Sequence, residues 1–271
     1  MKFTIITACR NAATTLPGAL ASVFRQELPE DVALEHIVMD GASTDETATV
    51  LRDWASRLAF VSQRGFDFRY TSESDQGLYD AINKGLDLAT GDIIGILNAD
   101  DVFATDDVIA RLAEAFRADP TLDLTYGDIR FVRAGGTVEE VRAAPVVRYC
   151  TGRWFRPWMF RFATFPAHPS TFVRAAAYRA AGPYSLAYPV CADFEMMLRL
   201  IRIHGVRTRY LPFCTTVMRL GGLSTSGFSS MAEINREDVR ALRANGIWSA
   251  LPLVYLKYLL KIWGYIFRGG L

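Results

Sequence analysis

The chain has 271 residues, 51% of them hydrophobic, and its 30 basic and 29 acidic residues leave a net charge of +1. A near-neutral chain of this length can bury one large core, and its charge does not call for a nucleic acid as partner. The four cysteines include no C-x-x-C pair, which favours neither a zinc site nor a disulfide framework and makes a reducing cytoplasm the simplest compartment.

Strand-like and helix-like patterns alternate through the first part of the chain. The spacing of apolar residues predicts strands at 3–9, 36–39, 68–71 and 93–97, and helices at 16–26 and 78–88. A further helix is expected after "GASTD", with Ser43 or Thr44 as its N-cap. This alternation predicts an α/β fold with a mostly parallel sheet covered by helices on both faces.

The second part of the chain is less regular. Residues 123–142 are expected to form a strand, a turn and a hairpin with Gly135 and Gly136 at the tip. Apolar residues at helical spacing predict a helix from Ala192 to His204. The aromatic and basic stretch 148–166 has no clear pattern. Because no repeat or low-complexity linker appears, a single globular unit is favoured over two tethered domains.

Several familiar kinds of site are absent from the sequence. It has no G-x-G-x-x-G after the first strand and no P-loop pattern, and "GGLSTSG" lacks the spacing of a serine nucleophile elbow. The three histidines, His36, His168 and His204, match no zinc-ligand spacing. Ordinary dinucleotide cradles, covalent serine catalysis and zinc chemistry are therefore not indicated.

Carboxylates at the ends of apolar strands are the most informative feature. Asp40 follows one strand, Asp100 and Asp101 follow another in "GDIIGILNADD", and Asp193 comes much later. Ligands of open α/β sheets bind at the carboxyl ends of the strands. Adjacent carboxylates repel by roughly 1 to 4 kcal/mol, so such a cluster needs a cation or strong donors, and oxygen ligands suit Mg²⁺ or Mn²⁺. The alternative is that Asp100 and Asp101 only cap a helix or begin a polar loop.

Five fragments follow one another along the chain: "TIITACRNAATTLPGALASV", "HIVMDGASTDETATVL", "SESDQGLYDAINKGLDLATGDIIGILNADD", "HPSTFVRAAAYRAAGPY" with "ADFEMMLRL", and "GGLS". In this order they resemble the inverting glycosyltransferases of family 2, which have the GT-A fold and use nucleotide-diphosphate sugars. The third is similar to a form common among members that build bacterial surface polysaccharides. The resemblance covers about the first 225 residues. It implies one GT-A domain over 1–228, with a nucleotide-sugar half at 1–105 and an acceptor half at 106–228, followed by C-terminal helices at 229–271.

The resemblance assigns the donor site residue by residue. Thr7, Cys9 and Asp40 would surround the base and ribose, and Asp75 and Asn83 would line the same pocket. Two alternatives stay open: Asp40 as a turn residue before a helix, and Asn83 as a tie between loops.

The D-x-D positions of the family are occupied by Asn98 and Asp100. Asparagine departs from the usual aspartate, so Asn98 is expected to bond the ribose rather than a metal ion. Asp100 is then the expected ligand of Mn²⁺ or Mg²⁺, with Asp101 as a weaker candidate. The metal would neutralise the charge that develops on the departing nucleoside diphosphate.

On the acceptor side, Asp193 in "CADFEMML" matches the aspartate that takes the proton from the attacking hydroxyl. His168, Arg219 and Gly222 are further candidates for contacts with the acceptor or diphosphate. A structural role for His168 and a solvated Arg219 are the alternatives. Gly222, with its neighbour Gly221, suits a lid that closes on the nucleotide.

The hydrophobic tail raises the question of a membrane. Lys257, Lys261 and Arg268 interrupt its apolar run and share one stripe of a helix, so segment 248–268 is expected to lie in a membrane interface rather than to span the bilayer. The alternative is a last helix that packs on the domain or in a homodimer interface.

Together these features predict a metal-dependent inverting glycosyltransferase, peripheral on the cytoplasmic face of a bacterial membrane, that extends a glycan or lipid-linked acceptor for the cell surface. A catalytically silent subunit that binds sugar nucleotides is an alternative from another class. A sugar nucleotidyltransferase would favour a basic, glycine-rich N-terminal signature, which is absent. The sugar, nucleotide base, acceptor and linkage depend on pocket shape, which local spacing does not report.

Overall fold

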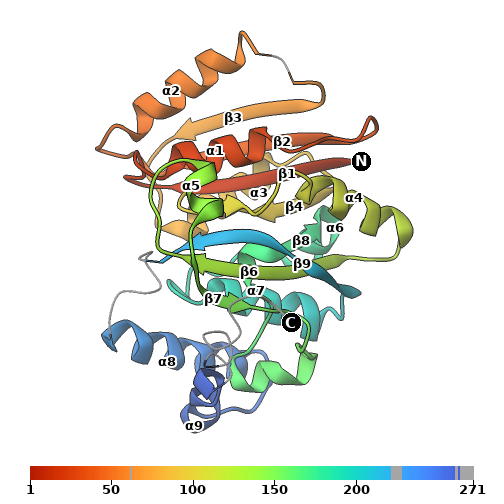
Figure 1. The fold of residues 1–271 in the computed structure, drawn as a ribbon. Coiled ribbons are helices and arrows are strands. Elements are labelled where there is room, and N and C mark those ends of the chain that lie inside the picture. Colours follow the sequence, from red (N-terminus) through yellow and green to blue (C-terminus); the bar gives the residue numbers. More distant parts are fainter. Residues whose placement is uncertain (62, 221–227, 260–261, 263–271) are drawn as a thin grey trace.

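The computed structural model describes residues 1–61, 63–220, 228–259 and 262. Strands within these ranges form one sheet with the order β3-β2-β1-β4-β8-β6-β9-β5, and β7 pairs with β6. Figure 1 shows α2 and β3 at one end of the molecule and α8 and α9 at the other. The bounds of the strands are β1 Lys2–Cys9, β2 Ala33–Asp40, β3 Phe66–Ser72, β4 Ile93–Ile96, β5 Val102–Phe103, β6 Leu124–Val132, β7 Val146–Cys150, β8 Thr171–Arg174 and β9 Thr208–Arg219.

Helices connect and cover these strands. The α-helices are α1 Leu16–Phe24, α2 Thr47–Leu58, α3 Leu78–Leu88, α4 Val108–Ala118, α5 Val138–Ala143, α6 Ala175–Ala181, α7 Ala192–Leu198, α8 Phe228–Ala244 and α9 Leu251–Tyr255. Two short 3₁₀ helices, η1 at Pro157–Phe162 and η2 at His168–Ser170, precede β8, and a π-helical turn at Arg199–Ile203, η3, extends α7. The helix expected from Ala192 to His204 is therefore present, with a widened last turn.

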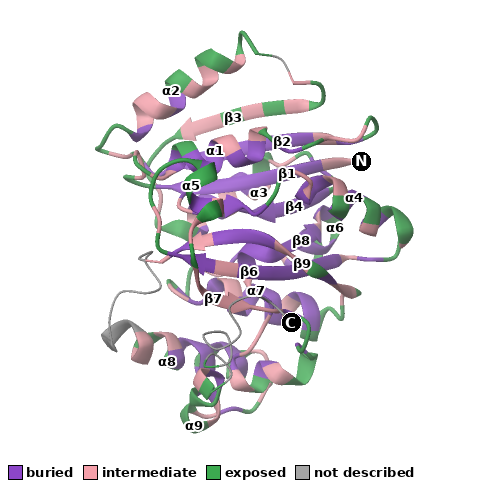
Figure 2. Ribbon diagram, in the orientation of Figure 1, coloured by how far each residue is buried: buried purple, intermediate pink, exposed green. Residues whose placement is uncertain are grey.

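The predicted α/β fold is confirmed. Strands β1 to β4 are parallel, whereas β8 joins β4 antiparallel and opens a mixed second half in which β6 and β9 are parallel. Alternate residues of β1 enter two cores: Ile6 packs with α3, α6 and α7, while Phe3 and Ile5 pack with α1 and α4. Figure 2 shows these central strands as almost wholly buried. Burial on both faces explains why their sequences are nearly continuous apolar runs.

Gly85 lets α3 approach the sheet closely. A Cβ atom at this position would lie 2.6 Å from Cγ2 of Ile6 on β1, which is closer than carbon atoms can pack. The close contact brings the start of α3, with Tyr79, to the same side of the sheet as α7. The bounds of α3 are those that the spacing of its apolar residues predicts.

The expected N-cap of α2 is wrong. The helix begins at Thr47, after Glu46, and neither Ser43 nor Thr44 caps it. The physical reason is that the preceding turn is held by other side chains: Asn11 Oδ1 accepts from the Thr44 amide at 2.8 Å, and Asp45 accepts from the Thr47 amide at 3.0 Å. Ser43 is used by Asp40 instead.

The expected hairpin at residues 123–142 is also only partly correct. After β6 the chain forms α5 rather than a second strand, because Thr137 and Glu140 make a capping box in which each side chain accepts from the other's backbone amide. The returning antiparallel strand is β7, which lies later in the chain.

Candidate active site

The parallel strands β1, β2 and β3 end side by side at Cys9, Asp40 and Ser72. The carboxylate of Asp40 lies among donors from this edge: it accepts from Ser72 Oγ at 2.6 Å, from the Ser43 amide at 3.3 Å and from the Ser43 hydroxyl. Only 2% of Asp40 is exposed. The turn after β2 is therefore built around this side chain, and the aspartate both ends a strand and organises the turn that precedes α2.

Asp75 meets the same turn. A Cβ atom at Gly41 would collide with its carboxylate, so glycine at position 41 lets the two loops touch. The Gly77 amide donates to Asp75 Oδ1 at 2.9 Å and fixes the side chain. The fold thus brings Asp75 to the turn that follows Asp40, and both residues are expected to line the same pocket.

Thr7 and Cys9 lie on β1, next to the strand that ends at Asp40, and both side chains are buried. Thr7 is fully buried, and its hydroxyl shares a hydrogen bond of 3.0 Å with His36 Nε2. The Cys9 thiol donates to Asp40 Oδ1 across 3.9 Å, and burial together with the Asp40 charge raises its pKa to about 12. The Cys9 side chain is therefore a neutral thiol against the Asp40 turn, while Thr7 supports β1 and β2 from inside the core.

The buried histidines should make the fold sensitive to acid. Burial lowers the pKa of His36 to about 3, so protonation favours the unfolded chain as the pH falls below about 6.5. We expect the unfolding free energy of His36→Gln, which keeps a partner for Thr7, to depend less on pH than that of the wild type, by about 2 kcal/mol between pH 7 and 5. Urea unfolding at both pH values measures this. His204→Gln, at an exposed position, is the control and should keep the wild-type slope; equal slopes in all three proteins would contradict the prediction.

The loop after β4 holds the second group of carboxylates. Asn98 Nδ2 donates to Asp101 Oδ2 at 2.9 Å, while Asp101 Oδ1 is buried and has no hydrogen-bond partner among the described residues. Burial, together with the charge of Asp100, raises the pKa of Asp101 well above its usual range. Asp100 is partly exposed, and burial raises its pKa as well. Of the two carboxylates, Asp100 is the one that a ligand can reach.

Arg219 closes this loop from the end of β9. Its guanidinium donates to the carbonyl of Asp100 at 2.9 Å and to that of Gly136 at 3.1 Å. Only 8% of the side chain is exposed, so Arg219 is not a solvated arginine. Burial lowers its pKa, and the charges of Asp100 and Asp101 oppose that shift. Gly222, expected in the lid after Arg219, lies outside the described residues.

Asp193 lies at the start of α7, across from the first turn of α3. Its Oδ1 accepts from the Phe194 amide at 2.8 Å and from the Tyr79 hydroxyl at 3.2 Å. The Tyr79 hydroxyl also lies 2.9 Å from the carbonyl of Val190. Burial raises the pKa of Asp193, and the bonds from Phe194 and Tyr79 oppose the rise. A carboxylate of this kind is suited to accept a proton.

His168 and Asn83 have structural partners. His168 Nε2 lies 2.7 Å from the Tyr184 hydroxyl, and burial lowers the pKa of His168 to about 4. Asn83 donates to the Tyr184 carbonyl at 2.9 Å and accepts from the Tyr184 amide at 2.7 Å. Tyr184 also stacks on Tyr79. Asn83 therefore ties α3 to the segment around Tyr184, and a tie between loops is the second of the two roles considered from the sequence.

The carboxylate oxygens of Asp100 and Asp101 supply some of the ligands that a hard divalent cation needs. No group of three or more His, Cys, Asp or Glu that could hold a metal ion occurs within the described part of the chain. Mg²⁺ typically takes only one or two protein carboxylates and completes its shell with substrate phosphates and water. The reachable carboxylate of Asp100 meets that smaller requirement, and the buried, unpartnered Oδ1 of Asp101 is a weaker second candidate.

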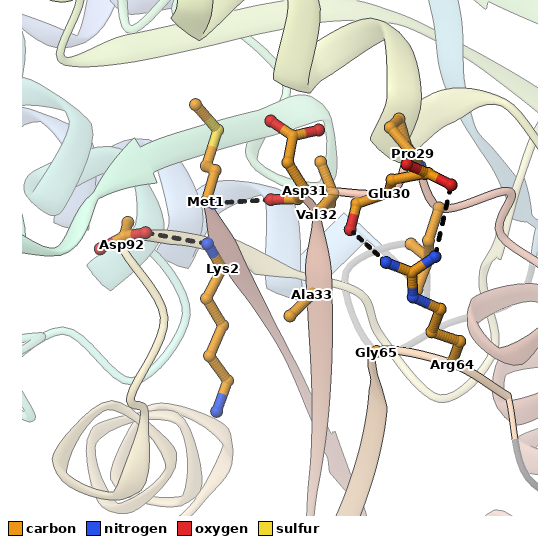
Figure 3. A pocket seen from close by; sticks show the side chains of 11 residues that line it. Met1, Lys2, Pro29, Glu30, Asp31, Val32, Ala33, Arg64, Gly65 and Asp92 are labelled. Atoms are coloured by element: carbon orange, nitrogen blue, oxygen red, sulfur yellow. Dashed lines mark hydrogen bonds and ion pairs between the residues drawn. The ribbon is translucent and has the colours of Figure 1, made fainter.

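A hollow of about 470 Å³ lies elsewhere (Figure 3). Met1, Lys2, Ala33, Gly65 and Asp92 line it, and these residues stand where the parallel strands begin. Within it, the Lys2 amide donates to Asp92 and Arg64 lies 3.6 Å from Glu30. This hollow is at the opposite ends of the strands from the carboxylates, so it is not part of the candidate site.

Sequence reasoning missed three residues that shape the site. Ser43 and Ser72 hold Asp40, and Tyr79 donates to Asp193. Ser43 belongs to a motif that the sequence does single out, but its expected role there was a helix cap and not a contact with Asp40. The partners of Ser72 and Tyr79 are 32 and 114 residues away in the chain, and no local pattern reports such contacts.

Comparison with known proteins gives matches to glycosyltransferases. The sequence model described as "Glycosyl transferase family 2" matches residues 4–173, more than half of the chain. A "PGL/p-HBAD biosynthesis glycosyltransferase" of Mycobacterium bovis is 32% identical over 228 residues, which are 83% of this chain and 79% of that protein. A poly-beta-1,6-N-acetyl-D-glucosamine synthase of Staphylococcus epidermidis is 27% identical over 52% of this chain and 32% of its own length.

Two solved structures share the fold. Residues 1–349 of S. aureus TarS in complex with UDP align with a TM-score of 0.61 at 15% identity, over 89% of this chain and 65% of that chain. The mannosyltransferase PcManGT from Pyrobaculum calidifontis, in complex with GDP-Man and Mn²⁺, aligns with a TM-score of 0.58 at 19% identity, over 95% and 78%. At these identities the likeness concerns the GT-A fold.

Proposed function

Because the chain belongs to glycosyl transferase family 2, we propose that it moves a sugar from a nucleotide-diphosphate sugar to a hydroxyl of a glycan or lipid-linked acceptor, with inversion at the anomeric carbon. The observation that carries the proposal is the placement of the carboxylate side chains in two places. Asp40, Asp100 and Asp101 lie at or just after the ends of parallel strands, and Asp193 lies at the start of α7. The three strand-end aspartates are suited to bind the donor, and Asp193 is suited to act on the acceptor hydroxyl.

The donor side is supported by the Asp40 turn and by the known ligands of similar structures. The buried Asp40 and the partly exposed Asp75 form a polar edge beside Cys9, where a base and ribose would lie. TarS has been solved with UDP and with UDP-GlcNAc, and PcManGT with GDP-Man and Mn²⁺. We therefore propose a nucleotide-diphosphate sugar as donor for this chain too.

Asp100 is the residue proposed to hold a divalent metal ion, with Asp101 as a weaker second ligand because it is buried and bonded to Asn98. Such an ion, when bound, offsets negative charge on the diphosphate. Arg219, fixed to the Asp100 carbonyl, contributes a second positive charge close to this loop. In this structure Asn98 bonds Asp101, and that bond orients the loop.

Asp193 is proposed as the general base. The oxygen of the acceptor hydroxyl forms a bond to the anomeric carbon, the bond from that carbon to the diphosphate oxygen breaks, and the hydroxyl proton moves to the Asp193 carboxylate. Oδ1 is held by Phe194 and Tyr79, and no described residue donates to Oδ2. Oδ2 is therefore the atom that would accept the proton. A single displacement of this kind inverts the configuration at carbon.

Tyr79 is expected to tune this base. Tyr79→Phe removes a donor to the Asp193 carboxylate, so the pKa of Asp193 should rise further. We expect kcat to fall several-fold at neutral pH and the acid limb of the pH–rate profile to move to higher pH. Tyr178→Phe is the control, since that hydroxyl bonds Tyr184 and not Asp193. An unshifted profile in Tyr79→Phe, or the same shift in both variants, would exclude this role.

The position of Lys257 in the tail differs from the one expected from the sequence. Lys257 does not belong to an exposed basic stripe: it is 6% exposed and lies 2.5 Å from Asp238 of α8. The ion pair forms because α9 packs on α8 and η1, which is the alternative considered for this segment. Lys261 and Arg268 lie outside the described residues. Among the described helices, none is both long and apolar enough to cross a membrane.

Apolar surface nevertheless remains on the tail. Trp248 is 67% exposed, Leu256 43% and Leu259 59%. We propose that these side chains lie in the membrane interface on the cytoplasmic face, where a lipid-linked acceptor would be presented. A homodimer that covers the same surface is the alternative.

Release of nucleoside diphosphate tests the proposed function. The protein is incubated with UDP- and GDP-linked sugars, with Mn²⁺ or with a chelator, and free nucleoside diphosphate is measured. We expect metal-dependent release from one class of donor. Tight binding of nucleotide without any release, with or without extracts that supply acceptors, would instead indicate a silent binding subunit.

A further inference from the structure

A short segment between β7 and β8 has an unusual surface. Residues 153–162, called here the Arg/Trp segment, run through η1 and expose Trp154 by 59% and Trp158 by 65%. Phe155 and Phe160 of the same segment are 6% and 0% exposed and pack in the core. The buried phenylalanines anchor the segment, so the two tryptophans are held outward by a fixed backbone.

The stretch of sequence that contains this segment is strongly basic. Residues 141–192 contain seven arginines and no aspartate or glutamate, although the whole chain has a net charge of only +1. Arg153, Arg156 and Arg161 are exposed, and none of them forms an ion pair with a described carboxylate. These three arginines therefore present positive charge without an ion-pair partner among the described residues, beside exposed tryptophan rings.

The segment is continuous with the tail. A hollow of about 220 Å³ is lined by Trp158, Arg161, Phe162, Arg202 and Ile247, among others. Ser249 Oγ donates to the Arg161 carbonyl at 2.7 Å, which fixes the start of the tail against η1. The exposed leucines of the tail thus extend from the same end of the molecule, which Figure 1 shows opposite α2.

We propose that the Arg/Trp segment is a second contact with an anionic phospholipid surface, in which arginines bind headgroup phosphates and the tryptophans lie at the level of the headgroups. This inference rests on the proposed membrane role of the tail and extends it to a separate part of the chain. Arginine pairs well with phosphate, and tryptophan is enriched at membrane interfaces. Each basic residue close to an anionic surface strengthens binding about fivefold.

Charge argues against a second copy of the chain as the occupant. A two-fold symmetric dimer places the same patch on both sides of the interface, so the arginines would face one another without carboxylates to pair with. An anionic bilayer supplies the opposite charge and an apolar layer for the neighbouring leucines.

Vesicle sedimentation tests the proposal with the full chain. Vesicles of phosphatidylcholine alone are compared with an equal mixture of phosphatidylcholine and phosphatidylglycerol. The test variant is R153Q/R161Q, and the matched control is R52Q/R57Q, which removes the same charge from exposed positions on α2 at the other end of the molecule. We expect R153Q/R161Q to bind the anionic vesicles roughly thirtyfold more weakly than the wild type and R52Q/R57Q to bind them as the wild type does.

Three outcomes would overturn the proposal: wild-type affinity in R153Q/R161Q, equal losses in both variants, or no preference of the wild type for anionic vesicles. A third variant, L256S/L259S, probes the tail separately and should weaken binding to both kinds of vesicle. Nucleoside diphosphate release from a soluble donor should be unchanged in R153Q/R161Q. Failure of that release in the wild type would count against the proposed function alone, because vesicle binding is measured without donor.

Discussion

Asp193→Asn should lower sugar transfer by roughly 100-fold or more while leaving donor and metal affinity nearly unchanged. The amide keeps the size of the side chain and can still accept from the Phe194 amide and the Tyr79 hydroxyl through its oxygen, so the start of α7 should keep its position. What it loses is the ability to take the acceptor's proton. Initial rates of transfer, with donor affinity measured by calorimetry, separate the two effects.

Glu195→Gln is the natural comparison, because Glu195 lies two positions further along α7. Its carboxylate accepts from Arg199 Nε at 2.8 and 2.9 Å and is buried, so it is engaged in a structural ion pair. We expect Glu195→Gln to lower thermal stability more than transfer per folded molecule. If Asp193→Asn were nearly as active as the wild type and Glu195→Gln were not, the base would have to be reassigned to Glu195.

Asp100→Ala should abolish the metal-dependent part of nucleotide binding. The described structure brings only one other carboxylate, that of Asp101, to this loop, and that side chain is fully buried and engaged with Asn98. Loss of Asp100 would leave too few oxygen ligands beside the diphosphate. Titration of nucleoside diphosphate with and without Mn²⁺ measures the effect.

Asp101→Asn provides the matched comparison for that titration. Asparagine retains an oxygen for the Asn98 amide, and it removes a carboxyl group whose ionisation is opposed by burial and by the charge of Asp100. We expect a smaller loss of metal-dependent affinity than in Asp100→Ala. Undiminished Mn²⁺-dependent affinity in Asp100→Ala would rule out this residue as the main metal ligand.

Much of the parallel part of the fold, from β1 to β4, was predictable from local sequence. Strands such as Ile93–Ile96 are buried on both faces, so every residue must be apolar and the pattern is unambiguous. Helix α3 alternates buried and exposed positions at helical spacing, and its bounds follow directly. The strand-end positions of Asp40 and Asp100 then follow from the topology of a parallel sheet.

Contacts between distant segments were not predictable in the same way. Asn83 binds Tyr184 and Tyr79 binds Asp193 across more than 100 residues of chain, and both contacts depend on how α3 packs against the segment that leads into α7. The start of α2 was mispredicted because Asn11, 33 residues away, accepts from the Thr44 amide, and because Asp45 rather than Ser43 or Thr44 accepts from the Thr47 amide. Lys257 was expected on the basic stripe of an interfacial helix, but it is buried and paired with Asp238 of α8.

The anomeric configuration of the first product tests the central claim most directly. With a donor whose sugar is α-linked to the nucleoside diphosphate, proton NMR during early turnover should show a β-configured product, because Asp193 and the diphosphate site are proposed to act from opposite sides of the reacting carbon. An α-configured product at early times would contradict a single displacement with Asp193 as base.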